Sequence, residues 1–473
     1  MPENRAWLPR AALVVGVVTF ARVVALWFNR TDLFVDESQY WLWGQRLDLG
    51  YYSKPPLIAW LIRAVTDLAG SDAPFFVRLP APFLHALTAL VLGAVAARLH
   101  SARAAIWVAA SYVTLPLAAL GSLLISTDTV MAPFFAAAIL LHQRAIASGR
   151  ITDSVAAGVA AGLGFLAKYA GIYFLLGTML AALFLPKARL RLRQWGAMLA
   201  AFLAVIAPNI LWNLGHDLAT VAHTLDNVGW VRQEAWWARL NPIGAVAFFL
   251  AQFAVAGPVL FSALLWAWLR PARPGLGPLI WLSAPIVAIV CTQAFLDKAY
   301  ANWAVAAYFA GTILAVVQML DRAPRLLPVS LAINGFVSLA LPVLAVVAPF
   351  PEIGGKPVLE RYLGRAELSR QIIETAQGNG VDTVVAVSRD ILADLFHTGR
   401  DTGLKFRAPR PAGRPRNYYE QTFPLTAGHG PALMVGEDAP RCAGDAVATF
   451  RTQGGAYSGK NLRGWILPQG CAP

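Results

Sequence analysis

The sequence predicts an all-α polytopic membrane protein followed by a small C-terminal α/β domain. Of its 473 residues, 57% are hydrophobic and 14% are charged, whereas soluble domains carry roughly 25% charged residues. Apolar runs of about 18 residues or more, each long enough to cross a bilayer, recur from residue 11 to about residue 347. Beyond residue 350, Pro, Gly and charged residues become more frequent. We therefore expect a transmembrane domain over residues 1–349 and a C-terminal domain over residues 350–473.

About eleven membrane spans are expected in the first domain, with boundaries good to a few residues. The fifth and sixth are separated only by a tight turn at residues 168–171. The expected spans cover residues 10–28, 79–97, 104–121, 128–147, 154–168, 170–186, 194–212, 242–269, 277–296, 300–320 and 326–348.

The loops between these spans differ in charge from one side of the membrane to the other. With a cytoplasmic N-terminus, every inside loop holds at least two basic residues, as the positive-inside rule requires. An odd number of spans then places the C-terminal domain outside. The net charge of +13 is explained by these loops and does not indicate a nucleic-acid partner. The basic residues of the inside loops are Arg5, Arg10, Arg98, Arg103, Arg144, Arg150, Lys187, Arg189, Arg191, Arg193, Arg270, Arg273, Arg322 and Arg325.

The first outside loop, residues 29–78, is expected to form two short helices along the membrane surface. Residues 37–49 can form an amphipathic helix that offers Tyr40, Trp41 and Trp43 to the lipid interface. Two prolines at 55–56 can start a second helix that continues to residue 68.

The C-terminal domain shows the pattern of alternating strands and helices. A strand is expected at residues 381–388, a helix at 389–397, and further strands at 432–436 and 446–450. No glycine motif for a nucleotide follows these strands. Cys442 and Cys471 both lie here, and either a disulfide outside the cytoplasm or two free thiols would fit them.

Asp36 and Glu37 form an adjacent carboxylate pair directly after the first apolar run. Charged groups at such a position are functional candidates, because charge is costly near the hydrocarbon. One carboxylate could act as general base on an acceptor hydroxyl. The alternative is structural, with Asp36 as the N-cap of the following helix and Glu37 in its first turn.

Further polar residues gather on the same outer side. Each has a structural alternative: Lys54 could snorkel to lipid headgroups, Asp128 could cap a helix together with its neighbours Ser126 and Thr127, and His216 with Asp217 could form a structural pair. Jointly they suit a substrate with a phosphate at the lipid–water boundary and a hydroxyl acceptor outside. The candidates for binding this substrate are Lys54, Asp128, Lys168, Tyr169, His216, Asp217 and Lys298.

Several motifs follow one another through the span region. In order and spacing they resemble the bacterial protein-mannosyltransferase-like and aminoarabinose-transferase-like group of the GT-C superfamily of membrane glycosyltransferases. Ser53 stands where the aminoarabinose-transferase branch tends to have glutamate, so a second carboxylate or a metal site there is not expected. The motifs are Asp36–Trp43, Gly50–Trp60, Ser126–Thr129, Ala167–Ala170 and Pro208–Asn213 with His216 and Asp217.

The resemblance implies an inverting transfer of a sugar from a polyprenyl-phosphate carrier, in bacteria usually undecaprenyl phosphate. The acceptor would be lipid A, another glycolipid, a polysaccharide or a protein at the periplasmic face of the inner membrane. Asp36 would be the catalytic carboxylate, Glu37 would assist it, and Lys54 would contact the carrier phosphate. Asp128 and Lys168 would line the same cavity. No cofactor is implied, and a divalent metal is compatible with the family without being indicated.

A transporter or flippase of lipid-linked sugars is the alternative function. It would explain a charged cavity equally well. Transporters often contain internal repeats with broken helices near the bilayer midplane. The sequence shows no clear repeat, and its polar residues gather at one face. The enzyme is therefore the favoured interpretation.

Overall fold

A computed structural model describes residues 5–227, 240–452 and 454–471 of the chain. It contains two compact units, each treated by itself below. The first unit comprises residues 1–27, 48–61 and 78–342, and the second comprises residues 28–47, 62–77 and 343–473. Two segments of the predicted first outside loop thus belong to the same compact unit as the C-terminal region. The division of the chain at residue 349 stays a prediction.

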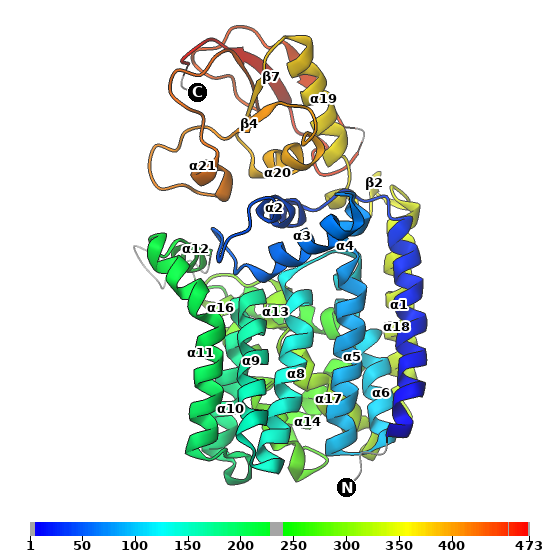
Figure 1. The fold of residues 1–473 in the computed structure, drawn as a ribbon. Coiled ribbons are helices and arrows are strands. Elements are labelled where there is room, and N and C mark those ends of the chain that lie inside the picture. The colour runs from blue at the N-terminus through cyan, green and yellow to red at the C-terminus, as the bar shows by residue number, and fades with distance from the viewer. Residues whose placement is uncertain (1–4, 228–239, 453, 472–473) are drawn as a thin grey trace. The chain divides into compact units, whose positions relative to one another are not determined.

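The first unit is a bundle of helices that run side by side (Figure 1). A 3₁₀ turn, Arg5–Trp7, leads into the first helix. The helices are α1 (Leu8–Trp27), α5 (Pro80–Leu99), α6 (Ala102–Val113), α7 (Pro116–Leu123), α8 (Thr127–Ser148), α9 (Ile151–Ala167), α10 (Tyr173–Phe184), α11 (Leu192–Gly215), α12 (Ala219–Asn227), α13 (Pro242–Ala256), α14 (Pro258–Leu269), α15 (Gly277–Trp281), α16 (Ala284–Leu296), α17 (Ala307–Arg322) and α18 (Leu326–Val347), whose last turn belongs to the second unit.

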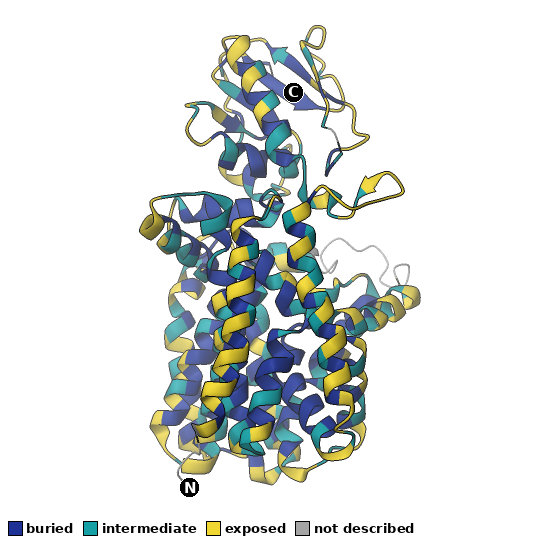
Figure 2. Cartoon of the chain, turned by 90° about the vertical axis from the view of Figure 1, so that its right-hand side faces the viewer, coloured by how far each residue is buried: buried dark blue, intermediate teal, exposed yellow. Residues whose placement is uncertain are grey.

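The α1 helix shows why these segments suit a bilayer. Its buried positions follow the helical period, since Ala11, Val15 and Thr19 all face the bundle. Between them, large apolar side chains such as Leu13 and Phe20 are 69% and 72% exposed, and Figure 2 shows this exposed stripe along the outside of the helix. Because an apolar surface of this kind is costly in water, it indicates contact with lipid.

The described residues contain six helices long and apolar enough to cross a membrane, or up to eight if each bent helix pair is one span. Each of the eleven expected spans coincides with helical structure. However, α9, α10 and α17 are shorter than 18 residues. The expected number of about eleven therefore stays a prediction, whereas a membrane protein with several spanning helices is confirmed.

The segment expected as one span over residues 242–269 is two helices, α13 and α14, bent by 114°. The break lies at Gly257, whose φ of +88° is unfavourable for other residues. Pro258 follows and cannot donate a backbone hydrogen bond to the preceding turn. Asn334 of α18 fills the break, because its Nδ2 donates to the Ala256 carbonyl oxygen at 3.1 Å. The backbone polar groups at the bend are thus partly satisfied inside the protein.

The second unit combines the helices α2 (Val35–Gly44) and α4 (Pro74–Arg78) and the end of α3 (Leu57–Ala69) with an α/β region. In the five-stranded sheet the order is β4-β3-β5-β7-β6. β3 is parallel to β4 and β5, whereas β7 is antiparallel to β5 and β6. The remaining elements are β1 (Glu352–Ile353), β2 (Lys356–Pro357), α19 (Arg365–Gly378), β3 (Thr383–Ala386), α20 (Arg389–Thr398), β4 (Lys405–Arg407), α21 (Tyr418–Thr422), β5 (Ala432–Gly436), β6 (Ala448–Phe450) and β7 (Leu462–Leu467).

The sheet confirms the elements expected in this region. The central strand β5 is buried along its whole length, which matches its uninterrupted apolar sequence. Its neighbour β3 is likewise buried from Val384 onward. The expected helix 389–397 is α20, whose N-cap is Ser388, since the Ser388 hydroxyl oxygen accepts from the Asp390 N–H at 3.2 Å.

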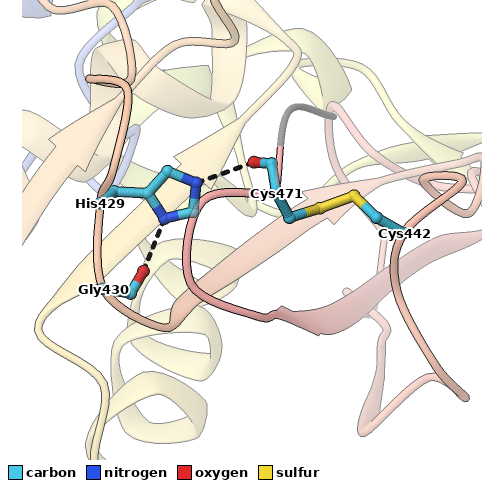
Figure 3. Close-up of a disulfide and its surroundings, with 4 residues drawn as sticks. All are labelled: His429, Gly430, Cys442 and Cys471. Atoms are coloured by element: carbon cyan, nitrogen blue, oxygen red, sulfur yellow. Dashed lines mark hydrogen bonds between the residues drawn. A yellow bond between two sulfur atoms is a disulfide. The ribbon is translucent and has the colours of Figure 1, made fainter.

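Cys442 and Cys471 form a disulfide, which decides between the two alternatives left open by the sequence (Figure 3). Their Cα atoms are 6.0 Å apart. The Cys471 carbonyl oxygen also accepts a hydrogen bond from Nε2 of His429 at 2.8 Å. The bridge therefore ties the segment after β7 to the loop after β5.

Removing this disulfide is expected to lower the free energy of unfolding of the α/β region by about 3–4 kcal/mol, because a 29-residue separation is closed by the bridge. The measurement is hydrogen exchange of β5 and β7 in the purified full-length Cys442→Ser/Cys471→Ser variant. The Cys291→Ser variant, which loses a free thiol in α16, is the control. Unchanged protection of both strands would contradict a stabilising role.

Candidate active site

The start of α2 carries the carboxylate pair. The N-cap residue is Phe34, so the structural alternative in which Asp36 caps this helix is wrong. Glu37 is buried, and its Oε2 accepts from the Phe34 N–H at 2.9 Å. A glutamate at the third helical position satisfies an otherwise unpaired donor in this way. Glu37 is therefore the residue that fixes the helix start, which leaves the Asp36 side chain available for other contacts.

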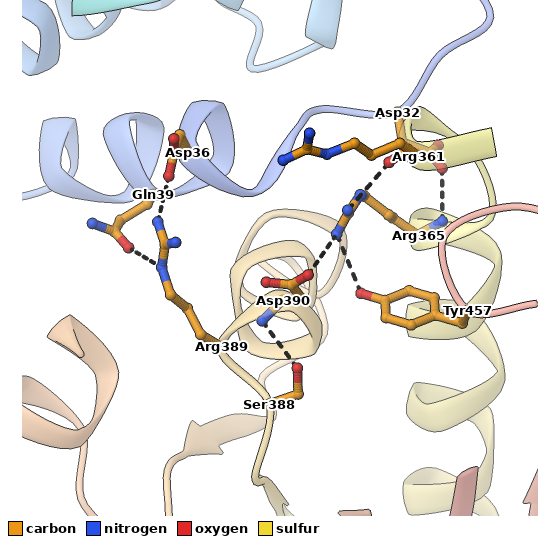
Figure 4. Close-up of polar contacts among 9 residues, drawn as sticks. All are labelled: Asp32, Asp36, Gln39, Arg361, Arg365, Ser388, Arg389, Asp390 and Tyr457. Atoms are coloured by element: carbon orange, nitrogen blue, oxygen red, sulfur yellow. Dashed lines mark hydrogen bonds and ion pairs between the residues drawn. The ribbon is translucent and has the colours of Figure 1, made fainter. Parts of the chain in front are cut away.

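Asp36 forms an ion pair with Arg389, the first residue of α20 (Figure 4). Nη2 of Arg389 lies 2.5 Å from Oδ1 of Asp36, and Nε donates to Oε1 of Gln39 at 3.0 Å. The two charged side chains are 47% and 36% exposed, so solutes can reach both. Burial alone would lower the pKa of Arg389, but the Asp36 carboxylate, together with Tyr419 and Tyr40, raises that pKa above its usual value. The guanidinium thus stays charged.

Aromatic contacts hold α2 against α20. The Trp41 ring meets His397 edge-on at a centroid distance of 4.8 Å. Asp72 links the two, since its Oδ1 accepts from Nε1 of Trp41 at 2.8 Å and its carbonyl oxygen accepts from Nε2 of His397 at 2.9 Å. The expectation that Tyr40, Trp41 and Trp43 face lipid is wrong. All three are buried, and the rings of Trp41 and Trp43 pack against His397 and Tyr418 of the α/β region.

The segment leading into α2 is anchored as well. Oδ2 of Asp32 accepts from the Arg365 N–H at 2.7 Å. Burial, with a smaller contribution from the nearby Asp394 carboxylate, raises the pKa of Asp32. The guanidinium groups of Arg361 and Arg365 lie over the Phe34 ring, 4.7 and 5.4 Å from its centroid. The position of Asp36 is therefore fixed by contacts of the residues before it, Asp32 and Phe34, and by contacts of Trp41 after it.

A second polar group lies in the first unit, around Asp128 and Lys168. Nζ of Lys168 lies 2.7 Å from both carboxylate oxygens of Asp128. The side chain of Asp128 is only 13% exposed and that of Lys168 only 16%. The cap of α8 is Ser126, whose hydroxyl oxygen accepts from the Thr129 N–H at 3.2 Å. The positive charge of Lys168 is thus balanced by Asp128, a contact that the separate motifs did not reveal.

Tyr169 joins this region to the loop that contains Lys54. Its hydroxyl donates to Oδ1 of Asn209 at 3.1 Å, and Nδ2 of Asn209 donates to the Leu49 carbonyl oxygen at 2.7 Å. A Cβ atom at Gly50 would lie 2.4 Å from the Trp212 ring, so only glycine fits there. The loop from residue 48 onward is therefore held by α11.

The remaining candidates are Lys54, His216, Asp217 and Lys298. The Lys54 carbonyl oxygen accepts from the Tyr51 N–H at 3.1 Å. His216 stacks on Trp212 at a centroid distance of 4.1 Å, and its Nδ1 donates to the Trp212 carbonyl oxygen at 2.8 Å. Asp217 has a positive φ of 53°. Lys298 is exposed. His216 therefore packs on its own helix rather than pairing with Asp217.

The candidate carboxylates and histidines could also form a metal site if they met in the described part of the chain. There, no group of three or more His, Cys, Asp or Glu side chains could hold a metal ion.

The sequence did not single out Arg389, although it predicted the helix that Arg389 starts. Its partner Asp36 lies 353 positions earlier, and nothing local to either residue signals the other. The one available signal was an arginine at the junction of an expected strand and helix, where charged side chains often serve a site.

Comparison with known proteins agrees with this fold. Residues 53–212 match the family described as dolichyl-phosphate-mannose-protein mannosyltransferase. The chain is 42% identical over 465 residues to the lipid A galacturonosyltransferase RgtD of Rhizobium johnstonii, covering 96% of this chain and 97% of the relative. The chain thus belongs to the GT-C superfamily of membrane glycosyltransferases, within the dolichyl-phosphate-mannose-protein-mannosyltransferase-like group, and is an enzyme.

Two solved structures share the fold. ArnT of Cupriavidus metallidurans in the apo state superposes with a TM-score of 0.66 at 16% identity, covering 96% of this chain and 97% of that chain. The same protein bound to undecaprenyl phosphate gives a TM-score of 0.63 at 15% identity and covers 98% of both chains. At such identities the likeness shows the fold alone.

Proposed function

We propose that this chain transfers a galacturonosyl group from a polyprenyl-phosphate carrier to lipid A, with inversion at the anomeric carbon. The observation that carries the proposal is the 42% identity, over nearly the whole length of both chains, to a lipid A galacturonosyltransferase. A galacturonate rather than an aminoarabinose donor also agrees with Ser53, which stands where the aminoarabinose-transferase branch tends to have glutamate. Undecaprenyl phosphate, the ligand of the ArnT structure, is the proposed form of the carrier.

Asp36 is the proposed general base. Its carboxylate takes the proton of the acceptor hydroxyl as that oxygen attacks the anomeric carbon of the donor sugar. The bond from this carbon to the carrier phosphate breaks on the opposite face, and the phosphate leaves as an anion. Arg389 contacts Oδ1 of Asp36 while the carboxylate stays half exposed. This geometry supports the role, because it orients the carboxylate without enclosing it.

The roles proposed for the other candidates follow from their charge and contacts. Lys54 is the proposed contact to the carrier phosphate, since a cation beside an anionic leaving group stabilises the developing charge. Lys168 and Asp128 are proposed to form an ion pair without net charge that shapes the substrate site, with Tyr169 beside them. His216, Asp217 and Lys298 are proposed as peripheral substrate contacts. Glu37 supports catalysis by fixing the start of α2.

The proposed location is the inner membrane, with the N-terminus in the cytoplasm and the C-terminal region in the periplasm. The distribution of basic residues between the loops supports this orientation. The Cys442–Cys471 disulfide supports it independently, because disulfides persist in oxidising compartments such as the periplasm.

The test is reconstitution of the purified protein with undecaprenyl-phosphate-linked galacturonate and lipid A. Mass spectrometry should detect lipid A that carries one added galacturonosyl group. Omission of the lipid-linked donor, or its replacement by a nucleotide-linked galacturonate, should give no product. Absence of transfer from the lipid-linked donor to lipid A, with correctly folded protein, would refute the proposal.

A further inference from the structure

The contact between Arg389 and Asp36 has a geometry that allows a second anion to bind. Two contacts of the guanidinium are used by Asp36 and Gln39. Because an arginine side chain carries five N–H donors in a planar fork, donors beyond these two contacts exist on the same group. The side chain is 36% exposed, so a small anionic group can approach it. Arg389 can therefore bind another carboxylate without releasing Asp36.

The position of Arg389 is fixed before any substrate arrives. It is the first residue of α20, where the Ser388 hydroxyl caps the helix. α20 packs on α2 through Trp41 and His397. The fork is thus presented beside Asp36 by rigid helical elements, which is the arrangement that gives an arginine geometric specificity for a carboxylate.

An acidic donor sugar creates an electrostatic problem next to Asp36. If Asp36 takes the proton of an acceptor hydroxyl that attacks the anomeric carbon of a galacturonosyl donor, it comes close to the carboxylate of the same sugar ring. Two like charges at such a separation repel each other strongly where water is excluded. A cation that contacts both carboxylates removes this repulsion, whereas a neutral sugar needs no such partner.

We propose that Arg389 is a specificity-determining residue that binds the carboxylate of a uronic acid donor while it holds Asp36. This inference rests on the proposed function, since it assumes that Asp36 is the base. It adds that the enzyme selects an acidic sugar over the neutral sugar of the same stereochemistry, and it assigns that selection to the C-terminal α/β region.

The experiment compares two donors, undecaprenyl-phosphate-linked galacturonate and undecaprenyl-phosphate-linked galactose, with the purified full-length enzyme. Wild type should prefer the galacturonate donor in kcat/KM. In the Arg389→Gln variant this preference should fall about 10- to 100-fold, the value of one charge-assisted hydrogen bond. The rate with the galactose donor should fall much less. Arg389→Lys, which keeps the charge, should retain part of the preference.

Arg400→Gln is the matched control, because Arg400 is similarly exposed, lies just beyond the end of α20 and pairs with Asp401. It should leave the preference unchanged. An equal loss with both donors in Arg389→Gln would overturn the inference and show that Arg389 acts only through Asp36. Thermal unfolding would reveal poor folding of Arg389→Gln. In that case the donor preference of Arg389→Lys, compared with that of wild type, would decide whether Arg389 sets the preference. Wild-type enzyme that transfers neither sugar would instead contradict the proposed function.

Discussion

Replacing Asp36 by Asn is expected to lower the rate of sugar transfer by about 10²- to 10⁴-fold, the usual contribution of a general base. The amide cannot accept the proton of the acceptor hydroxyl. It can still accept a hydrogen bond from Arg389 through Oδ1, so α2 and α20 should remain in contact. The measurement is the initial rate of transfer by the purified variant, together with its thermal unfolding temperature.

Glu37→Gln is the control for this prediction, because it removes a carboxylate from the adjacent position. The Gln side-chain oxygen can still accept from the Phe34 N–H, the contact that Glu37 makes at 2.9 Å. This variant should therefore keep most of its activity. If Glu37→Gln were as inactive as Asp36→Asn, the catalytic role could not belong to Asp36 alone. Full activity in Asp36→Asn would end its assignment as the base.

Those parts of the structure that depend on local pattern could be predicted from the sequence. Long apolar runs gave the positions of the helices, because each must satisfy its backbone polar groups internally in lipid. The apolar segment 381–388 predicted a strand and the segment after it predicted a helix at 389–397, which the structure has as β3 and α20. A helix was expected at residues 37–49, whereas α2 begins at Val35 and ends at Gly44, so the acidic first turn indicated a helix start only to within two residues. Asp36 and Lys54 could be named as candidates because charge is rare in this chain.

Long-range contacts could not be predicted in the same way. The burial of Trp41 and Trp43 depends on the α/β region, which lies more than 300 residues later in the sequence. Aromatic residues in a membrane protein suit both a lipid interface and a protein contact, and only the tertiary structure decides between them. The same holds for Lys168, whose charge indicated an anionic substrate until its contact with Asp128 was known. The bend at Gly257 had a local signal in the Gly257-Pro258 pair. The continuous apolar sequence around this pair nevertheless led to the prediction of one unbroken span.

The pair of Lys168 and Asp128 gives a second large effect. Replacing Lys168 by Met is expected to lower the free energy of unfolding by about 2–3 kcal/mol, because it leaves the Asp128 carboxylate unpaired in a mostly buried site. The measurement is thermal and denaturant unfolding of the purified variant in detergent. Asp128→Asn alone should also destabilise the protein, since it leaves the ammonium group without its partner.

The double variant Asp128→Asn/Lys168→Met separates stability from function. It contains neither charge, so most of the lost stability should return, and the double-mutant cycle should give a coupling energy of about 1–3 kcal/mol. If the pair only shapes the site, transfer should return together with stability. If Lys168 contacts the substrate, the double variant should be stable and inactive, with a raised KM for the donor. Additive losses of stability would contradict the ion pair itself.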